Sequence, residues 1–136
     1  MPEGGCLCGK IRISFEGEPE AKVLCHCADC RKITGSAFST NALVPAARFA
    51  VAAGQPRTLE RRAESGNPIT SHFCGDCGTT LWREGPGYAG FKIVKTGVLD
   101  DPAATFDALR PAAELFVRSR AAWLSPIPGA EQKETA

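Results

Sequence analysis

Apolar and polar side chains alternate along much of this chain, which is the period of a β-strand rather than of a helix. The clearest case is residues 10–16, Lys-Ile-Arg-Ile-Ser-Phe-Glu, where an apolar side chain occupies every second position. Weaker alternation predicts further strands at residues 22–24, 37–44, 49–52, 57–61, 69–73, 80–83, 90–96 and 114–117. Turns rich in glycine and proline separate these runs, so the pattern predicts a mostly β protein.

Helical segments are expected to be short, because no stretch keeps a helical period for long. We predict helical turns at residues 27–33, after Asp101-Pro102, and at residues 118–124. Residues 125–136 carry prolines followed by a polar run, and we expect them to form a disordered tail. Residues 1–124 are expected to fold as one small domain.

The composition fits a globular domain without a strongly charged binding surface. The chain has 136 residues, of which 43% are apolar, and its net charge is +1. Domains that bind nucleic acids are usually strongly basic, so we expect no nucleic-acid partner. The most apolar stretch, residues 42–54, is interrupted by Pro45 and Arg48 and is too short to span a bilayer. We therefore expect no membrane association.

Seven cysteines in tight groups are the strongest chemical signal. They lie at Cys6-x-Cys8, Cys25-x-Cys27-x-x-Cys30 and Cys74-x-x-Cys77. Structural zinc sites close with four ligands, whereas catalytic zinc sites keep a coordination position open. Seven divides into four and three, which predicts two zinc ions per chain. We expect a closed cluster of Cys6, Cys8, Cys74 and Cys77 and an open cluster of Cys25, Cys27 and Cys30.

Other uses of these cysteines fit less well. No signal-peptide pattern precedes them, and an odd number would leave one thiol over in a disulfide framework. A thioredoxin-like pair expects a βαβ setting, which the short apolar runs do not supply. A ribbon of Cys27, Cys30, Cys74 and Cys77 is an alternative, but it leaves an awkward remainder. Because the thiols are kept for metal, we expect a reducing cytoplasm.

Three linked motifs resemble the glutathione-dependent formaldehyde-activating enzyme (Gfa) family. They are residues 4–9 (GGCLCG), 25–38 (CHCADCRKITGSAF) and 73–79 (FCGDCGT), and the likeness runs from about residue 4 to Trp123. The resemblance implies a β-tent fold, a structural zinc on the closed cluster and a catalytic zinc on the open cluster. It also implies a carbon–sulfur lyase reaction that forms or cleaves S-(hydroxymethyl)glutathione, with glutathione or another small thiol and an aldehyde as partners.

Three charged positions bear on the substrate. Glu114 stands where family members often carry a histidine, so another substrate is expected if that histidine touches substrate or metal. Arg31 and Lys32 directly follow the open cluster and are candidates to meet the carboxylates of glutathione. Balancing the thiolate charge, or a solvated turn, explains this pair equally well.

Two function classes other than an enzyme fit the same cysteines. A zinc-stabilised binding module would use the open cluster as an adaptor surface. A thiol or zinc redox sensor would use its susceptibility to oxidation and metal exchange. The enzyme is favoured, and His26, between Cys25 and Cys27, is expected to point away from the metal rather than bind it.

Overall fold

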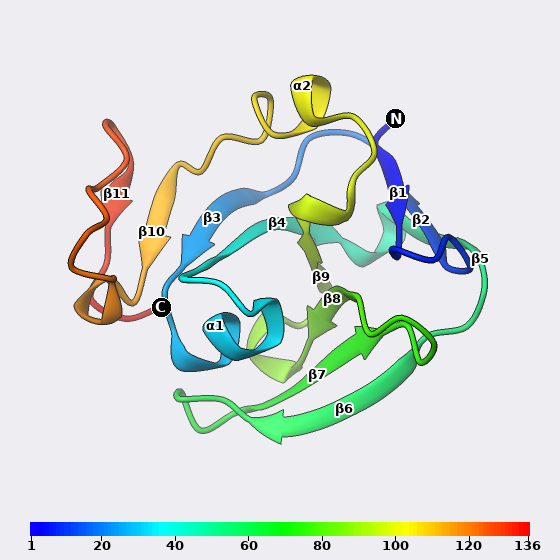
Figure 1. Cartoon of the computed structure of the whole chain (residues 1–136), viewed down its shortest axis with the longest axis horizontal. Helices are drawn as coiled ribbons and strands as arrows, with labels where there is room; N and C mark the ends of the chain where they lie inside the picture. The colour runs from blue at the N-terminus through cyan, green and yellow to red at the C-terminus, as the bar shows by residue number, and fades with distance from the viewer.

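The strands of this protein form two sheets that share one core (Figure 1). The computed structural model describes residues 1–136, apart from the side chain of Ala104. A small sheet has the strand order β1-β2-β5, and a large sheet has the order β11-β10-β3-β4-β9-β8-β7-β6. The predicted mostly β architecture is confirmed.

Each run of alternating residues corresponds to a strand of one of the two sheets. The small sheet consists of β1 (Glu3–Gly5), β2 (Arg12–Phe15) and β5 (Phe49–Ala53). The large sheet consists of β3 (Ala21–Cys25), β4 (Ser39–Pro45), β6 (Arg57–Arg62), β7 (Pro68–Phe73), β8 (Thr80–Glu84), β9 (Phe91–Lys95), β10 (Ala113–Leu115) and β11 (Glu131–Gln132). β10 and β11 run parallel to their neighbours, and the other paired strands are antiparallel.

Helices are short, as the sequence predicts. The α-helices are α1 (Ala28–Thr34) and α2 (Pro102–Thr105). Single 3-10 turns lie at Ala46–Arg48, Pro86–Tyr88, Thr96–Val98 and Val117–Ser119. The last of these is all that forms of the helical turn expected at residues 118–124. Within the described part of the chain, no helix has the length and apolar character needed to cross a membrane.

β1 was missed by the alternation pattern because it contains two adjacent glycines, which rarely occupy strands. Its glycine content has a packing reason in the structure. A Cβ added at Gly4 would lie 2.1 Å from the carbonyl oxygen of Val98. Gly4 therefore lets the segment around Leu99 approach closely enough to form a β-bridge with it.

β11 lies in the segment expected to be a disordered tail, and that expectation is wrong here. Glu131–Gln132 pairs with β10, and the N–H of Ile127 donates to the carboxylate of Glu114 at 2.8 Å. Composition pointed to disorder because the segment has few apolar residues to bury. The structure holds it instead by backbone pairing and by hydrogen bonds to a buried carboxylate.

The two faces of the large sheet have different roles. On one face, Ala42, Val44 and Val94 are completely buried against Ile13 and Phe15 of the small sheet. Complete burial of a valine, isoleucine or phenylalanine side chain stabilises a fold by about 1.5–3 kcal/mol. The large sheet curves, and α1 lies in the hollow of its other face (Figure 1). The open cluster lies at this second face.

Candidate metal centres and active site

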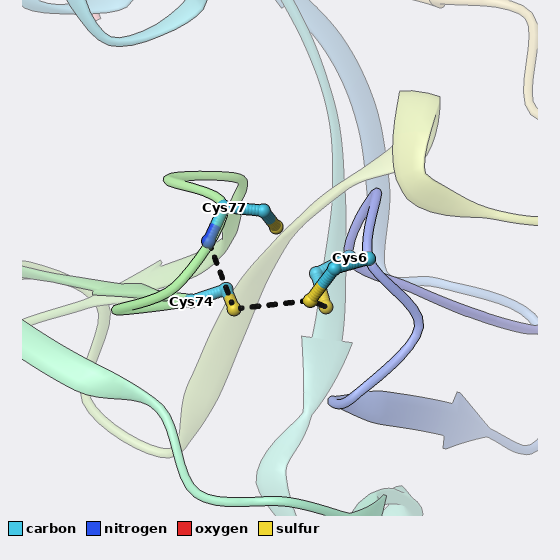
Figure 2. Close-up of side chains that lie close together, drawn as sticks. Cys6, Cys74 and Cys77 are labelled. Carbon is cyan, nitrogen blue, oxygen red and sulfur yellow. Dashed lines mark hydrogen bonds between the residues drawn. The ribbon is translucent and has the colours of Figure 1, made fainter.

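Cys6, Cys8, Cys74 and Cys77 converge from two distant loops. Figure 2 shows Cys6 facing Cys74 and Cys77 across this site. The four sulfur atoms lie within 4.8 Å of one another. The Sγ atoms of Cys6 and Cys8 are 3.6 Å apart, and those of Cys8 and Cys74 are 3.7 Å apart. Zinc–sulfur bonds of about 2.3 Å place tetrahedral ligands about 3.8 Å apart. The closed cluster therefore has the dimensions of a four-thiolate zinc site.

Both loops of the closed cluster aim backbone N–H groups at a sulfur. Ile11 donates to Cys6 Sγ at 3.3 Å, and Cys77 donates to Cys74 Sγ at 3.5 Å. Each loop also contains a glycine with a φ of +82°, Gly9 and Gly78, a conformation that costs glycine little. Donors aimed at sulfur favour the thiolate over the thiol. The loops thus aim donors at two of the four cysteines, an arrangement that could support thiolates bound to a metal ion.

The open cluster forms where β3 passes into α1. Cys25 is the last residue of β3, Cys27 is the N-cap of α1, and Cys30 lies in its first turn. Cys27 Sγ accepts the N–H of Cys30 at 3.3 Å, and Gly35 ends the helix with a φ of +63°. The three sulfur atoms lie within 4.8 Å of one another. They can bind one ion and leave a coordination position for substrate.

The thiols of the open cluster differ in acidity. Hydrogen bonds with Cys25 and then with Cys27 lower the pKa of Cys30 to about 2. Hydrogen bonds with Cys27 and Cys30 raise the pKa of Cys25 instead. Cys30 is thus the most acidic of the three thiols, because the same contacts raise the pKa of Cys25 and the pKa of Cys27 is also raised. Binding a divalent cation to all of them must therefore release protons.

A cavity of about 290 Å³ adjoins the open cluster, and all three of its cysteines border it. Lys95 lines this cavity although only 6% of its surface is exposed. Its Nζ donates to Asn41 Oδ1 at 2.7 Å. Burial lowers the pKa of Lys95, while the charge of Cys30 opposes this effect. The cavity thus places a buried amino group beside the thiols.

Comparison with known proteins agrees with these two clusters. The sequence pattern of the family described as "Glutathione-dependent formaldehyde-activating enzyme" matches residues 1–119. The chain belongs to this family. Both cysteine clusters lie inside the matched residues, whereas β11 lies beyond them.

A solved structure supports the fold. A crystal structure of a Rhodobacter sphaeroides protein from structural genomics matches with a TM-score of 0.59. The match covers 74% of this chain and 92% of that chain, and the two sequences are 19% identical. No curated protein matches the chain.

Arg31 and Lys32 lie on α1 with exposed side chains, and neither lines the cavity beside the open cluster. The structure therefore brings the predicted cysteines together but leaves this cationic pair outside the cavity. Sequence reasoning missed Lys95 and Asn41, which do line it. Lys95 ends an ordinary alternating strand, and nothing in its local sequence separates it from a solvated lysine.

Glu114, the position singled out in the sequence for its bearing on the substrate, does not line the cavity beside the open cluster. Its side chain is 2% exposed and lies 2.8 Å from His26 Nε2. His26 therefore points away from the thiols, as the alternation predicts. Burial raises the pKa of Glu114, but hydrogen bonds from Gln132, then His26 and Ile127, lower it to about 2. Glu114 ties the C-terminal segment to β3.

Glu114→Gln is expected to destabilise the protein by about 2 kcal/mol at pH 7, because charged hydrogen bonds are lost and an amide N–H₂ faces other donors. A lowered carboxyl pKa stabilises the fold above its unfolded value near 4.5, and this stabilisation disappears as the pH falls toward 2. Urea denaturation from pH 7 to pH 3 should show the difference shrinking. Glu131→Gln, which changes an exposed side chain of β11, is the control. Equal stability of Glu114→Gln and wild type at pH 7 would contradict the role of Glu114.

Zinc should be lost from this protein in two phases when a chelator is added. The closed cluster would surround an ion with four thiolates, whereas the open cluster would leave a coordination position facing the cavity. The open cluster should therefore empty first, and elemental analysis at intervals should find about half of the zinc retained. Loss in one uniform phase, or no zinc in reduced protein, would refute the division into two sites.

Proposed function

We propose that the protein forms and cleaves the carbon–sulfur bond of a thiol–aldehyde adduct, with S-(hydroxymethyl)glutathione as the first candidate. The site is the open cluster of Cys25, Cys27 and Cys30. The observation that carries the proposal is the position of these three thiols. Their sulfur atoms lie close together, and the cysteines border a cavity that is also lined by the buried amino group of Lys95. Family membership supports the same chemistry.

The open cluster suits a zinc ion that keeps one coordination position free. When bound, such an ion supplies charge that keeps the substrate sulfur deprotonated at neutral pH. Two of its cysteines, Cys25 and Cys30, are buried, and Cys27 is half-buried. The protein side of the cluster is thus closed to water, and the substrate sulfur enters from the cavity.

Lys95 is the residue placed to bind the oxygen of the adduct. A lysine amino group has several N–H donors, and Asn41 accepts one of them. The remaining N–H groups of Lys95 can donate hydrogen bonds to the substrate oxygen, on which negative charge develops during the reaction. In cleavage the electron pair of the carbon–sulfur bond goes to sulfur. The hydroxyl proton passes to solvent water, and the oxygen becomes the carbonyl of the aldehyde. Addition is the reverse.

Cysteines that serve as metal ligands must stay reduced, so we propose that the protein works in a reducing compartment such as the cytoplasm. Glutathione is abundant as a thiol under the same conditions and is the first partner to test. Formaldehyde is the simplest aldehyde for the first assay.

The proposal is tested by exchange NMR of glutathione with formaldehyde, because the adduct also forms without a catalyst. Zinc-loaded wild type should accelerate exchange over a sample without protein. Protein from which a chelator has removed only the zinc of the open cluster should not accelerate exchange. Equal exchange rates in all three samples would remove the formaldehyde reaction while leaving the metal sites in place.

A further inference from the structure

The second face of the large sheet changes from polar to apolar with distance from the open cluster. Nearest the cluster, Cys25 pairs with Ser39 across β3 and β4. In the next row on this face, Asn41 pairs with both Val23 and Lys95. Alternation keeps every second residue of a strand on one face, so these side chains and those of the following row point the same way.

The following row is entirely apolar and consists of Ala21, Leu43 and Ile93, paired across β3, β4 and β9. We call it the apolar row. All three residues line the cavity and are only half-buried. Ala42 and Val94, which point to the opposite face of the same strands, are completely buried. The apolar row is thus surface that the fold leaves for the cavity.

The wall along β10 is also apolar and is held in an unusual backbone conformation. Leu115 and Phe116 line the cavity there. Among the described residues, Phe116 is the non-glycine residue with a positive φ, +55°. Its N–H donates to the carbonyl of Thr135 at 3.2 Å. Residues of the C-terminal segment therefore fix an aromatic side chain in the cavity wall in a conformation that L-residues rarely adopt.

The apolar row does not complement glutathione, whose two carboxylates, ammonium and peptide groups would be buried there against apolar side chains without partners. Charged side chains line other parts of the same cavity, among them Asp29, Arg83 and Lys133, and these can meet the charged groups of glutathione. Formaldehyde has no substituent on its carbon and would leave the apolar row in contact with water. The volume of about 290 Å³ lies just below the range of small-molecule pockets, which span about 300–1,000 Å³. The cavity therefore has room for more than a one-carbon aldehyde.

We propose that the preferred adduct carries an alkyl chain or ring on the carbon bonded to sulfur, and that this substituent lies on the apolar row of Ala21, Leu43 and Ile93. The aldehyde is then a larger apolar one, and glutathione keeps its charged groups at the mouth of the cavity. This proposal rests on the proposed function and names its substrate class. The bonds made and broken are the same: the electron pair of the carbon–sulfur bond returns to sulfur, and the hydroxyl proton passes to solvent water as the apolar aldehyde forms.

The first experiment compares exchange of glutathione with hexanal and with formaldehyde, each as the acceleration over a sample without protein. We expect an acceleration at least about tenfold larger for hexanal, because a single methylene in an apolar pocket contributes about tenfold or more to selectivity. A larger acceleration for formaldehyde would overturn this proposal while leaving the proposed function intact. The same assay is run with butanethiol and formaldehyde. If the protein accelerates this exchange more than that of glutathione with hexanal, the apolar group belongs on the thiol, and the proposal of an apolar aldehyde is overturned.

Two variants connect selectivity to the apolar row. Leu43→Asn should lower the ratio of hexanal to formaldehyde acceleration about tenfold, and Ala21→Phe should lower it by filling the space. The second variant adds no polar group and guards against a folding failure of the first. Val51→Asn, at a partly exposed position of β5 on the other sheet, is the matched control and should keep the ratio. Unchanged ratios in folded Leu43→Asn and Ala21→Phe would contradict the apolar row.

A binding measurement separates this proposal from the proposed function. Calorimetry on zinc-loaded wild type should show S-hexylglutathione binding about tenfold or more tightly than S-methylglutathione. This readout needs no turnover. If neither aldehyde reacts faster with protein but the hexyl compound still binds tightly, the lyase function fails and the apolar site stands. Equal binding of the two compounds would overturn the apolar site.

Discussion

Cys77→Ser is expected to prevent stable folding of the protein, and Cys6→Ser should do the same. Cys77 belongs to the closed cluster, which joins the loop after β1 to the loop between β7 and β8. A structural zinc of this kind contributes about 10 kcal/mol, whereas whole domains are stable by only about 5–15 kcal/mol. Losing one ligand thus removes a large share of the stability. In Cys77→Ser, the sulfur of the buried Cys6 would also lose the metal as its partner.

Circular dichroism and thermal melting of zinc-loaded samples measure this effect, with elemental analysis of the zinc retained. Cys27→Ser is the matched control, since it makes the same exchange of sulfur for oxygen in the open cluster. A cooperative melt of Cys77→Ser at the wild-type temperature would show that the closed cluster does not stabilise the fold.

Cys27→Ser is expected to leave a folded protein with activity lowered at least about 100-fold. Changing even a residue that hydrogen-bonds to a metal ligand typically lowers metal affinity or activity about 10–100-fold. Cys27 is itself a predicted ligand, so a larger loss is expected. The fold should tolerate the change because Cys27 is the N-cap of α1 and accepts the N–H of Cys30. Serine is among the preferred N-cap residues, so its hydroxyl can replace that acceptor.

The exchange assay and the thermal melt are read together for this variant. The zinc that a chelator removes first should be missing, and the slowly released zinc should remain. If Cys27→Ser melted as early as Cys77→Ser, the structural and catalytic roles of the clusters would be assigned wrongly. Wild-type exchange rates in a folded Cys27→Ser would exclude the open cluster from the reaction.

The sequence by itself determined most strands and the grouping of the cysteines. Alternation is a local pattern, so residues 10–16 predict β2 without knowledge of any partner strand. Spacing is local too: Cys25, Cys27 and Cys30 lie close enough along the chain to bind one ion unaided. The family followed from such motifs, since they are short and contiguous.

The tertiary structure decided what depends on long-range pairing. Cys8 and Cys74 are separated by 66 positions, and their meeting was a hypothesis until both loops were placed. The burial of Lys95 follows from its pairing with Asn41 on a central strand, and an isolated alternating run cannot show which face is covered. β11 likewise forms only because β10 offers it an edge and Glu114 offers it hydrogen-bond acceptors.

The cavity has the same origin. Ala21, Leu43 and Ile93 become one apolar row only when β3, β4 and β9 lie in register, because each strand contributes a single residue to it. In the sequence nothing distinguishes them from other apolar residues of alternating runs. A one-residue slip in register would move such side chains to the opposite face. The metal ligands are thus determined largely by local spacing, and the substrate cavity by the registration of strands distant in the chain.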